Sequence, residues 1–209
     1  MRVEKLRDLV ARLHALPRRR LTLLVGVDGP VGSGKTTFTR ALMALDPGLD
    51  VIQTEDFGQA GPTTGNGEHG GGPGHELEVD WRRLRSHVLL PLGRDQPARY
   101  QRFDRATAAM AEWRMVPVGG IVIVEGRYAC CRPLTAFYDF RIWVDAAPEV
   151  RRARWLARPA TAAGAWDPTR PQVEEAYLPG QDPARAANLR VDGSGAPPHD
   201  PASEYVRVR

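Results

Sequence analysis

Short apolar runs alternate along this chain with segments in which apolar residues recur at helical spacing. Residues 21–27 form the first run, as a buried strand requires, and residues 36–45 follow with apolar side chains about one helical turn apart. Residues 119–124 and 140–144 are further apolar runs, as is typical of strands buried within a parallel sheet. Shorter strands are expected at 49–53 and 188–191, and helices at 2–16 and 148–158. This order predicts an α/β fold of about five parallel strands with helices on both faces of the sheet.

Three segments depart from this alternation. Residues 58–75 are rich in glycine and proline, which cannot fill a core, so we expect a long mobile loop at the end of the second strand. This loop is either a functional flap or a solvent-exposed excursion. Residues 159–171 follow an arginine-rich helix and are a candidate lid, and the polar, proline-rich residues 193–209 form a tail with no assigned function. The 209 residues should form a single domain that begins with a helix within residues 1–18.

Composition and charge narrow the classes of function. The formal net charge is +4, and the longest basic run, Arg18-Arg19-Arg20, lacks interleaved aromatic residues, so nucleic acid is not an expected partner. No apolar run approaches the ~18 residues of a membrane span, and the first residues lack the apolar core of a signal peptide. The only cysteines, Cys130 and Cys131, are adjacent, which fits a reducing compartment better than a disulfide framework. We therefore expect a cytoplasmic protein without a membrane partner.

The most specific motif lies between the strand expected at residues 21–27 and the helix expected at residues 36–45. Residues 29–36 fit the phosphate-binding loop pattern G-x-x-x-x-G-K-[ST] at every fixed position, with the required strand before and helix after. The loop's N–H groups and the helix N-terminus should attract a polyphosphate. Lys35 would reach the β- and γ-phosphates, and the Thr36 hydroxyl would hold Mg²⁺. The predicted nucleotide-binding residues are Gly29, Pro30, Val31, Gly32, Ser33, Gly34, Lys35, Thr36 and Thr37.

Two acidic residues follow apolar strands. Glu125 ends the run at residues 122–124, as in a Walker-B arrangement, and Asp56 follows the second strand. Because ligands bind at the carboxyl ends of parallel strands, both side chains should face the phosphate loop. Glu125 could hold Mg²⁺ through water, and Asp56 could accept a proton from an attacking hydroxyl or join the metal shell. The two roles could be exchanged, and either acid alone could be a solvated residue at a strand end.

The order of these motifs resembles the uridine kinase-like P-loop kinases, whose relatives include phosphoribulokinase and bacterial pantothenate kinase. The resemblance spans residues 20–192 and includes the segments 80–84 and 100–104. It implies a P-loop NTPase fold, ATP or another nucleoside triphosphate as phosphate donor, Mg²⁺ as cofactor, and Asp56 as the catalytic aspartate. The substrate-contacting residues predicted on this basis are Tyr100, Arg102, Asp104 and Arg127.

The chain departs from this family in the half that would bind the acceptor. Phe57 is followed by Gly58 where the family has tyrosine, and the segment after it is expanded and rich in glycine. The family's lid helix carries an Arg-Arg and an Arg-Asp pair, of which only Arg154 and Arg158 remain. These two arginines lie one turn apart and could still neutralise a transferring phosphate, or they could belong to a charged surface helix.

Three functions are compatible with these residues. The first is a kinase that transfers the γ-phosphate of ATP to a hydroxyl, most readily that of a nucleoside. The second is the same transfer to another alcohol, such as a pantothenate-like or secondary-metabolite acceptor. The third is a nucleotide-binding regulatory protein with little turnover, although Lys35, Thr36, Asp56 and Glu125 favour an enzyme. The predicted catalytic residues are Lys35, Asp56, Glu125, Arg154 and Arg158. The chain lacks the Asn-Lys-x-Asp guanine motif of a GTPase. A homo-oligomer is compatible with all three.

Overall fold

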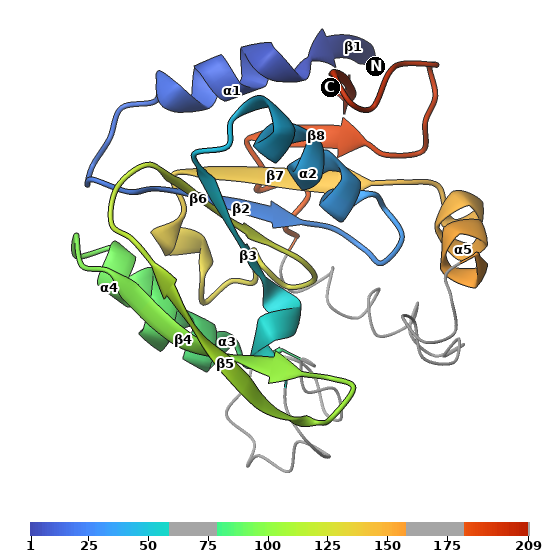
Figure 1. Ribbon diagram of the computed structural model, residues 1–209. Coiled ribbons are helices and arrows are strands. Elements are labelled where there is room, and N and C mark those ends of the chain that lie inside the picture. Colours follow the sequence, from blue (N-terminus) through green and yellow to red (C-terminus); the bar gives the residue numbers. More distant parts are fainter. Residues whose placement is uncertain (59–78, 158–181, 209) are drawn as a thin grey trace.

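The computed structural model describes residues 1–58, 79–157 and 182–208 (Figure 1). Most of the loop predicted at 58–75, the lid predicted at 159–171 and Arg158 lie outside the described residues.

A parallel sheet forms the centre of the molecule, as predicted. Its strands are β2 (Leu23–Asp28), β3 (Leu49–Gln53), β6 (Ile121–Glu125), β7 (Phe140–Asp145) and β8 (Leu189–Asp192). They run side by side in the order β8-β7-β2-β6-β3, so the strand before the phosphate loop is the middle one. Val27 of β2 pairs with Glu125 of β6, which confirms that the runs at 21–27 and 119–125 share a sheet. The carboxyl ends of these strands therefore meet at one edge.

Two antiparallel strands extend the sheet beyond β8. Strand β9 (Glu204–Val208) pairs with β8, and β1 (Arg2–Lys5) pairs with β9. The prediction of a helix from residue 2 was therefore wrong over its first four residues, because these residues pair with a strand at residues 204–207, near the other end of the chain. The helix α1 (Leu6–His14) begins directly afterwards. The C-terminal tail predicted over 193–209 likewise contains a sheet strand.

Helices cover both faces of the sheet, and the alternation of side chains in β2 explains why. Leu23 and Val25 face α1 and α2 (Lys35–Leu45), where they pack in one apolar cluster with Leu6 and Leu42. Leu24 points to the other face, into a second cluster. The helical segments of that second cluster include α3 (Trp81–Leu84), the π-helical turn η2 (Arg85–Leu89) and α4 (Leu90–Leu92). Figure 1 shows α1 and α2 together on one side of the sheet and α3 and α4 on the other. A strand buried on both faces reads as a continuous apolar run.

The chain between β3 and β6 includes a separate hairpin that the sequence patterns did not predict. Its strands, β4 (Ala98–Asp104) and β5 (Ala109–Val116), pair antiparallel outside the main sheet. The β4 residues Ala98, Tyr100 and Phe103 are buried, whereas Trp113 and most other residues of β5 are exposed. The buried side of β4 packs on the short 3₁₀ helix η1 (Thr54–Phe57), which carries Asp56.

The remaining helices are short. Helix α5 (Pro148–Leu156) follows β7 beside the phosphate loop, and the 3₁₀ turn η3 (Thr135–Phe137) precedes β7. In the part of the chain that the structure describes, no helix combines the length and apolar character that a membrane crossing needs.

Candidate active site

The phosphate loop joins β2 to α2, and two of its glycines are required by the backbone. Gly29 has φ +151°, and a Cβ placed there would lie 2.0 Å from the carbonyl oxygen of Val144 in β7. Gly34, with φ +101°, lies in the left-handed region immediately before the first turn of α2. Any larger residue would strain the loop or push it off the neighbouring strand. The glycine pattern therefore fixes a tight loop whose N–H groups lie at a helix N-terminus.

Lys35 is folded over this loop. Its side chain is buried, and Nζ donates to the carbonyl oxygens of Gly29 at 2.8 Å and Pro30 at 2.9 Å. These backbone carbonyl groups are neutral, so the ammonium group of Lys35 keeps its net positive charge. The positive charge of Lys35 is therefore held within the loop, where a polyphosphate would need it.

Glu125 meets Thr36 at the same edge of the sheet. Thr36 Oγ1 donates to Glu125 Oε1 at 3.0 Å, and the glutamate is 2% exposed. Burial raises the pKa of Glu125, with a further increase from Glu55, while Lys35 and Thr36 oppose that rise. Glu125 Oε2 is buried and accepts no hydrogen bond from any described residue. A buried carboxylate oxygen beside a threonine hydroxyl is a donor set that fits Mg²⁺, which takes oxygen ligands.

Asp56 lies at the adjacent strand end, because Gln53 at the end of β3 pairs with Glu125. One of its oxygens, Oδ2, accepts from Tyr100 Oη at 2.8 Å and lies 3.4 Å from Arg114 Nη1. The other oxygen, Oδ1, accepts no hydrogen bond from the residues that the structure describes. Burial raises the pKa of Asp56, although Tyr100 and Arg114 favour its charged form. The hairpin thus fixes one carboxylate oxygen and leaves the other available to an acceptor hydroxyl.

Arg83 anchors the segment that carries Asp56. Its Nη2 donates to the backbone carbonyl of Asp56 at 2.9 Å, and its guanidinium lies 5.1 Å from the centre of the Phe57 ring. The Phe57 ring in turn lies 4.9 Å from the Tyr100 ring. The position of Asp56 therefore depends on α3, η1 and β4 together.

The other predicted site residues lie in three places. Arg154 of α5 donates from Nη1 to the Gly32 carbonyl at 3.2 Å, so it reaches the phosphate loop. Arg102 pairs with Glu112 at 2.7 Å and with Asp104 at 3.6 Å, both on the hairpin itself. Arg127 is buried after β6, with its guanidinium 5.8 Å from the centre of the Tyr128 ring. Arg102 and Asp104 are thus joined to their own hairpin rather than to Asp56 by hydrogen bonds.

Arg114 and Asp28 were missed by the sequence reasoning. Arg114 stands opposite Tyr100 in the hairpin register, which a prediction of β4 and β5 would have revealed. Asp28 ends the apolar strand β2, which is the same signal that identified Glu125. Its carboxylate is 1% exposed and accepts from the backbone N–H groups of Gly29 at 2.7 Å, Tyr128 at 3.1 Å and Cys130 at 3.0 Å. Asp28 thereby ties the phosphate loop to the segment that follows Glu125.

We expect Asp28→Asn to lower the free energy of unfolding by about 2 kcal/mol, the usual value of a hydrogen bond to a charged group. The Asp28 carboxylate accepts through both of its oxygens, whereas an asparagine side chain has one acceptor oxygen. At least one of the three N–H groups therefore loses its partner. Denaturant unfolding measures the effect. The control is Asp8→Asn, since Asp8 is exposed on α1. Equal stability of the two variants would contradict a structural role for the Asp28 carboxylate.

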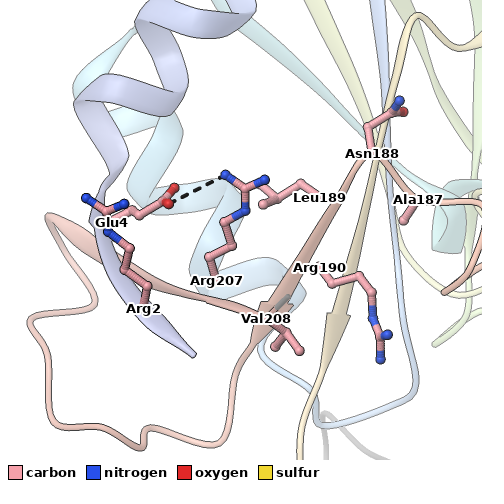
Figure 2. A pocket seen from close by; sticks show the side chains of 8 residues that line it. All are labelled: Arg2, Glu4, Ala187, Asn188, Leu189, Arg190, Arg207 and Val208. Carbon is pink, nitrogen blue, oxygen red and sulfur yellow. Dashed lines mark ion pairs between the residues drawn. The ribbon is translucent and has the colours of Figure 1, made fainter.

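A pocket of 390 Å³ lies away from this site, at the edge formed by β1, β9 and the start of β8 (Figure 2). Its lining includes Arg2, Arg190 and Arg207, but Arg207 pairs with Glu4 at 3.5 Å. Figure 2 shows the Arg190 side chain pointing away from that ion pair. The three arginines do not converge, and none of the predicted site residues lines this pocket.

Known proteins resemble the chain in sequence and in structure. No protein-family model matches the chain. The chain is 29% identical over 148 residues to a uridine kinase from Deinococcus deserti, which covers 68% of this chain and 70% of that protein. It is 26% identical over 149 residues to the inorganic pyrophosphatase TTM2 of Arabidopsis thaliana. That match also covers 68% of this chain, but the chain spans only 20% of the plant protein's length.

A solved structure has a similar fold over most of the chain. It is described as that of a possible uridine kinase from Bacillus stearothermophilus, and it matches with a TM-score of 0.64 at 20% identity. The match covers 88% of this chain and 96% of the other. The parallel sheet, the phosphate loop and the flanking helices define the P-loop kinase fold. In sequence and structure the chain is similar to the uridine kinase-like P-loop kinases, which confirms the resemblance predicted from its motifs.

Proposed function

We propose that this chain is an ATP-dependent kinase that transfers the γ-phosphoryl group to a hydroxyl of a small molecule. The observation that carries the proposal is that two sets of groups border one edge of the sheet. The first set is the phosphate loop with Lys35, Thr36 and Glu125. The second is Asp56, whose Oδ1 accepts no hydrogen bond from the described residues. A donor site and a candidate base at one edge of the sheet are what phosphoryl transfer requires.

The residues of the two sets would have separate roles in the transfer. The loop N–H groups and Lys35 would bind the phosphates and neutralise the charge that spreads over the transferring group. Thr36 and Glu125 would hold Mg²⁺, which supplies further charge neutralisation when bound. Asp56 would accept a hydrogen bond from the acceptor hydroxyl and take its proton as the oxygen attacks the γ-phosphorus. The bond to the bridging oxygen breaks, and ADP leaves. Arg154, which contacts Gly32, lies near enough to the loop to assist.

The acceptor implied by the resemblance is a nucleoside, and the alternative is a non-nucleoside alcohol. The chain differs from the family at Gly58, where a tyrosine is usual. A Cβ at Gly58 would lie 2.5 Å from the Phe103 ring of the hairpin, so no larger side chain fits there without movement. The part of the site that would bind the acceptor therefore packs differently from a site with tyrosine at this position.

A screen with ADP release as the readout tests the proposal. Purified protein with ATP and Mg²⁺ is given a panel of nucleosides and other alcohols, and the phosphorylated product is detected by mass. We expect at least one alcohol to stimulate ADP release and to gain one phosphoryl group. Tight ATP binding without any alcohol-dependent turnover would instead indicate a nucleotide-binding regulatory protein.

A further inference from the structure

Arg114 differs from the other arginines around Asp56 in how its guanidinium is used. Arg83 donates to backbone carbonyls, including that of Asp56, and Arg102 is paired with two carboxylates of its hairpin. Arg114 lies on the exposed strand β5 and its side chain is 48% exposed. Its Nη1 is 3.4 Å from Asp56 Oδ2, which is long for a charge-assisted hydrogen bond.

Most of the hydrogen-bonding capacity of Arg114 is unused by the described residues. A guanidinium has five N–H donors in a fixed fork. In the described ranges, the hydrogen bond to Asp56 is the only one that the Arg114 guanidinium makes. Tyr100 already donates to the same Asp56 oxygen at 2.8 Å, so that oxygen does not depend on Arg114 for a partner. A half-exposed cation with free donors thus lies beside the candidate base.

We propose that Arg114 is a specificity-determining residue that binds an anionic group of the acceptor, so that the acceptor is an alcohol that also carries a carboxylate or a phosphate. This inference rests on the proposed function. The acceptor hydroxyl would hydrogen-bond to Asp56 Oδ1, and the anionic group would bind the guanidinium beside Oδ2. Because both oxygens belong to one carboxyl group, the hydroxyl and the anion are separated by only a few bonds. The planar fork of arginine matches the geometry of either oxyanion.

The proposed role of Arg114 distinguishes a nucleoside acceptor from a non-nucleoside alcohol. A neutral nucleoside has no oxyanion near its hydroxyls and would leave most of the Arg114 N–H donors without a partner. An acidic alcohol, such as a hydroxy acid or a phosphorylated polyol, would accept from them. The inference therefore favours the non-nucleoside acceptor.

Matched acceptors test the inference directly. D-glycerate and glycerol 3-phosphate are compared with glycerol, which lacks the anion, and with uridine, by ADP release. We expect at least one anionic acceptor to have a higher kcat/KM than both neutral ones, and the better anion identifies the group. Arg114→Gln should lower kcat/KM for that acceptor by about 10- to 100-fold, mainly through KM, the usual effect of losing a hydrogen bond between charged groups. The KM for ATP should be unchanged.

The control is Arg99→Gln on the same hairpin. Arg99 lies opposite Met115, one position from Arg114, and its guanidinium stacks 4.3 Å from the centre of the Trp113 ring. This variant should behave as the wild type does. A wild-type preference for glycerol or uridine, or an unchanged preference for anions in Arg114→Gln, would overturn the inference.

A binding measurement separates this inference from the proposed function. If no alcohol stimulates ADP release, the proposed function fails, and calorimetry then tests Arg114 alone. D-glycerate and glycerol 3-phosphate are titrated into protein saturated with a non-hydrolysable ATP analogue. Binding to the wild type that is lost in Arg114→Gln supports an anion site. Absent binding, or equal binding to both proteins, rules it out.

Discussion

Lys35→Ala should reduce turnover by on the order of 10² or more, because electrostatic positioning carries most of the catalysis of phosphoryl transfer. The variant removes the charge that would follow the transferring group. Nucleotide affinity should fall less, since the loop N–H groups that bind phosphate remain. Steady-state ADP release gives the turnover, and calorimetry with ATP gives the affinity.

The chain contains its own control for this experiment. Lys5 is the only other lysine, and it lies on β1, where it pairs with Glu204 at 2.6 Å and is 49% exposed. An exposed ion pair contributes little to stability, so Lys5→Ala should turn over as the wild type does. Turnover near the wild-type rate in Lys35→Ala would mean that this phosphate loop is not the catalytic one.

Asp56→Asn should reduce the rate with a saturating acceptor on the order of 10²-fold, the usual value of general-base catalysis. Asparagine keeps the size of the side chain, and its oxygen can still accept from Tyr100. It removes the negative charge that orients the acceptor hydroxyl and takes its proton. Because the transition state of phosphoryl transfer is loose, much of the effect should come from orientation. ATP binding should change far less than the rate.

Glu125→Gln distinguishes the roles of the two acids. It removes the charge of the carboxylate whose Oε2 has no hydrogen-bond partner among the described residues, so the Mg²⁺ concentration for half-maximal rate should rise. ADP release for both variants is measured across Mg²⁺ concentrations. If Asp56→Asn turns over normally once Mg²⁺ is saturating, then Asp56 belongs to the metal shell and is not the base.

The central sheet could be predicted because its information is local. Strands β2 and β6 are buried along their whole length and read as nearly continuous apolar runs, as residues 121–124 do. The phosphate loop is a contiguous motif with its strand and helix on either side. Glu125 follows from the rule that ligands bind at the carboxyl ends of parallel strands.

The parts that the sequence did not predict depend on distant partners. Strand β1 exists because Val3 faces Val206 at the other end of the chain, and its four residues fit a helix equally well. In the hairpin, β5 is mostly exposed, so its apolar residues follow no buried face. Asp28 has a local signal at the end of β2, and only its partners Tyr128 and Cys130 are distant in sequence. Arg114, by contrast, owes its position to the hairpin pairing. The same holds for Arg102, whose partner Glu112 is set by the hairpin pairing.

The most direct test of the proposed function is the mass of the product formed by the wild type and by Lys35→Ala with ATP, Mg²⁺ and the best acceptor of the screen. We expect an acceptor that gains one phosphoryl group together with one ADP released, at a rate at least about 10²-fold lower in the variant. ATP hydrolysis without a phosphorylated acceptor, or equal product from both proteins, would contradict it.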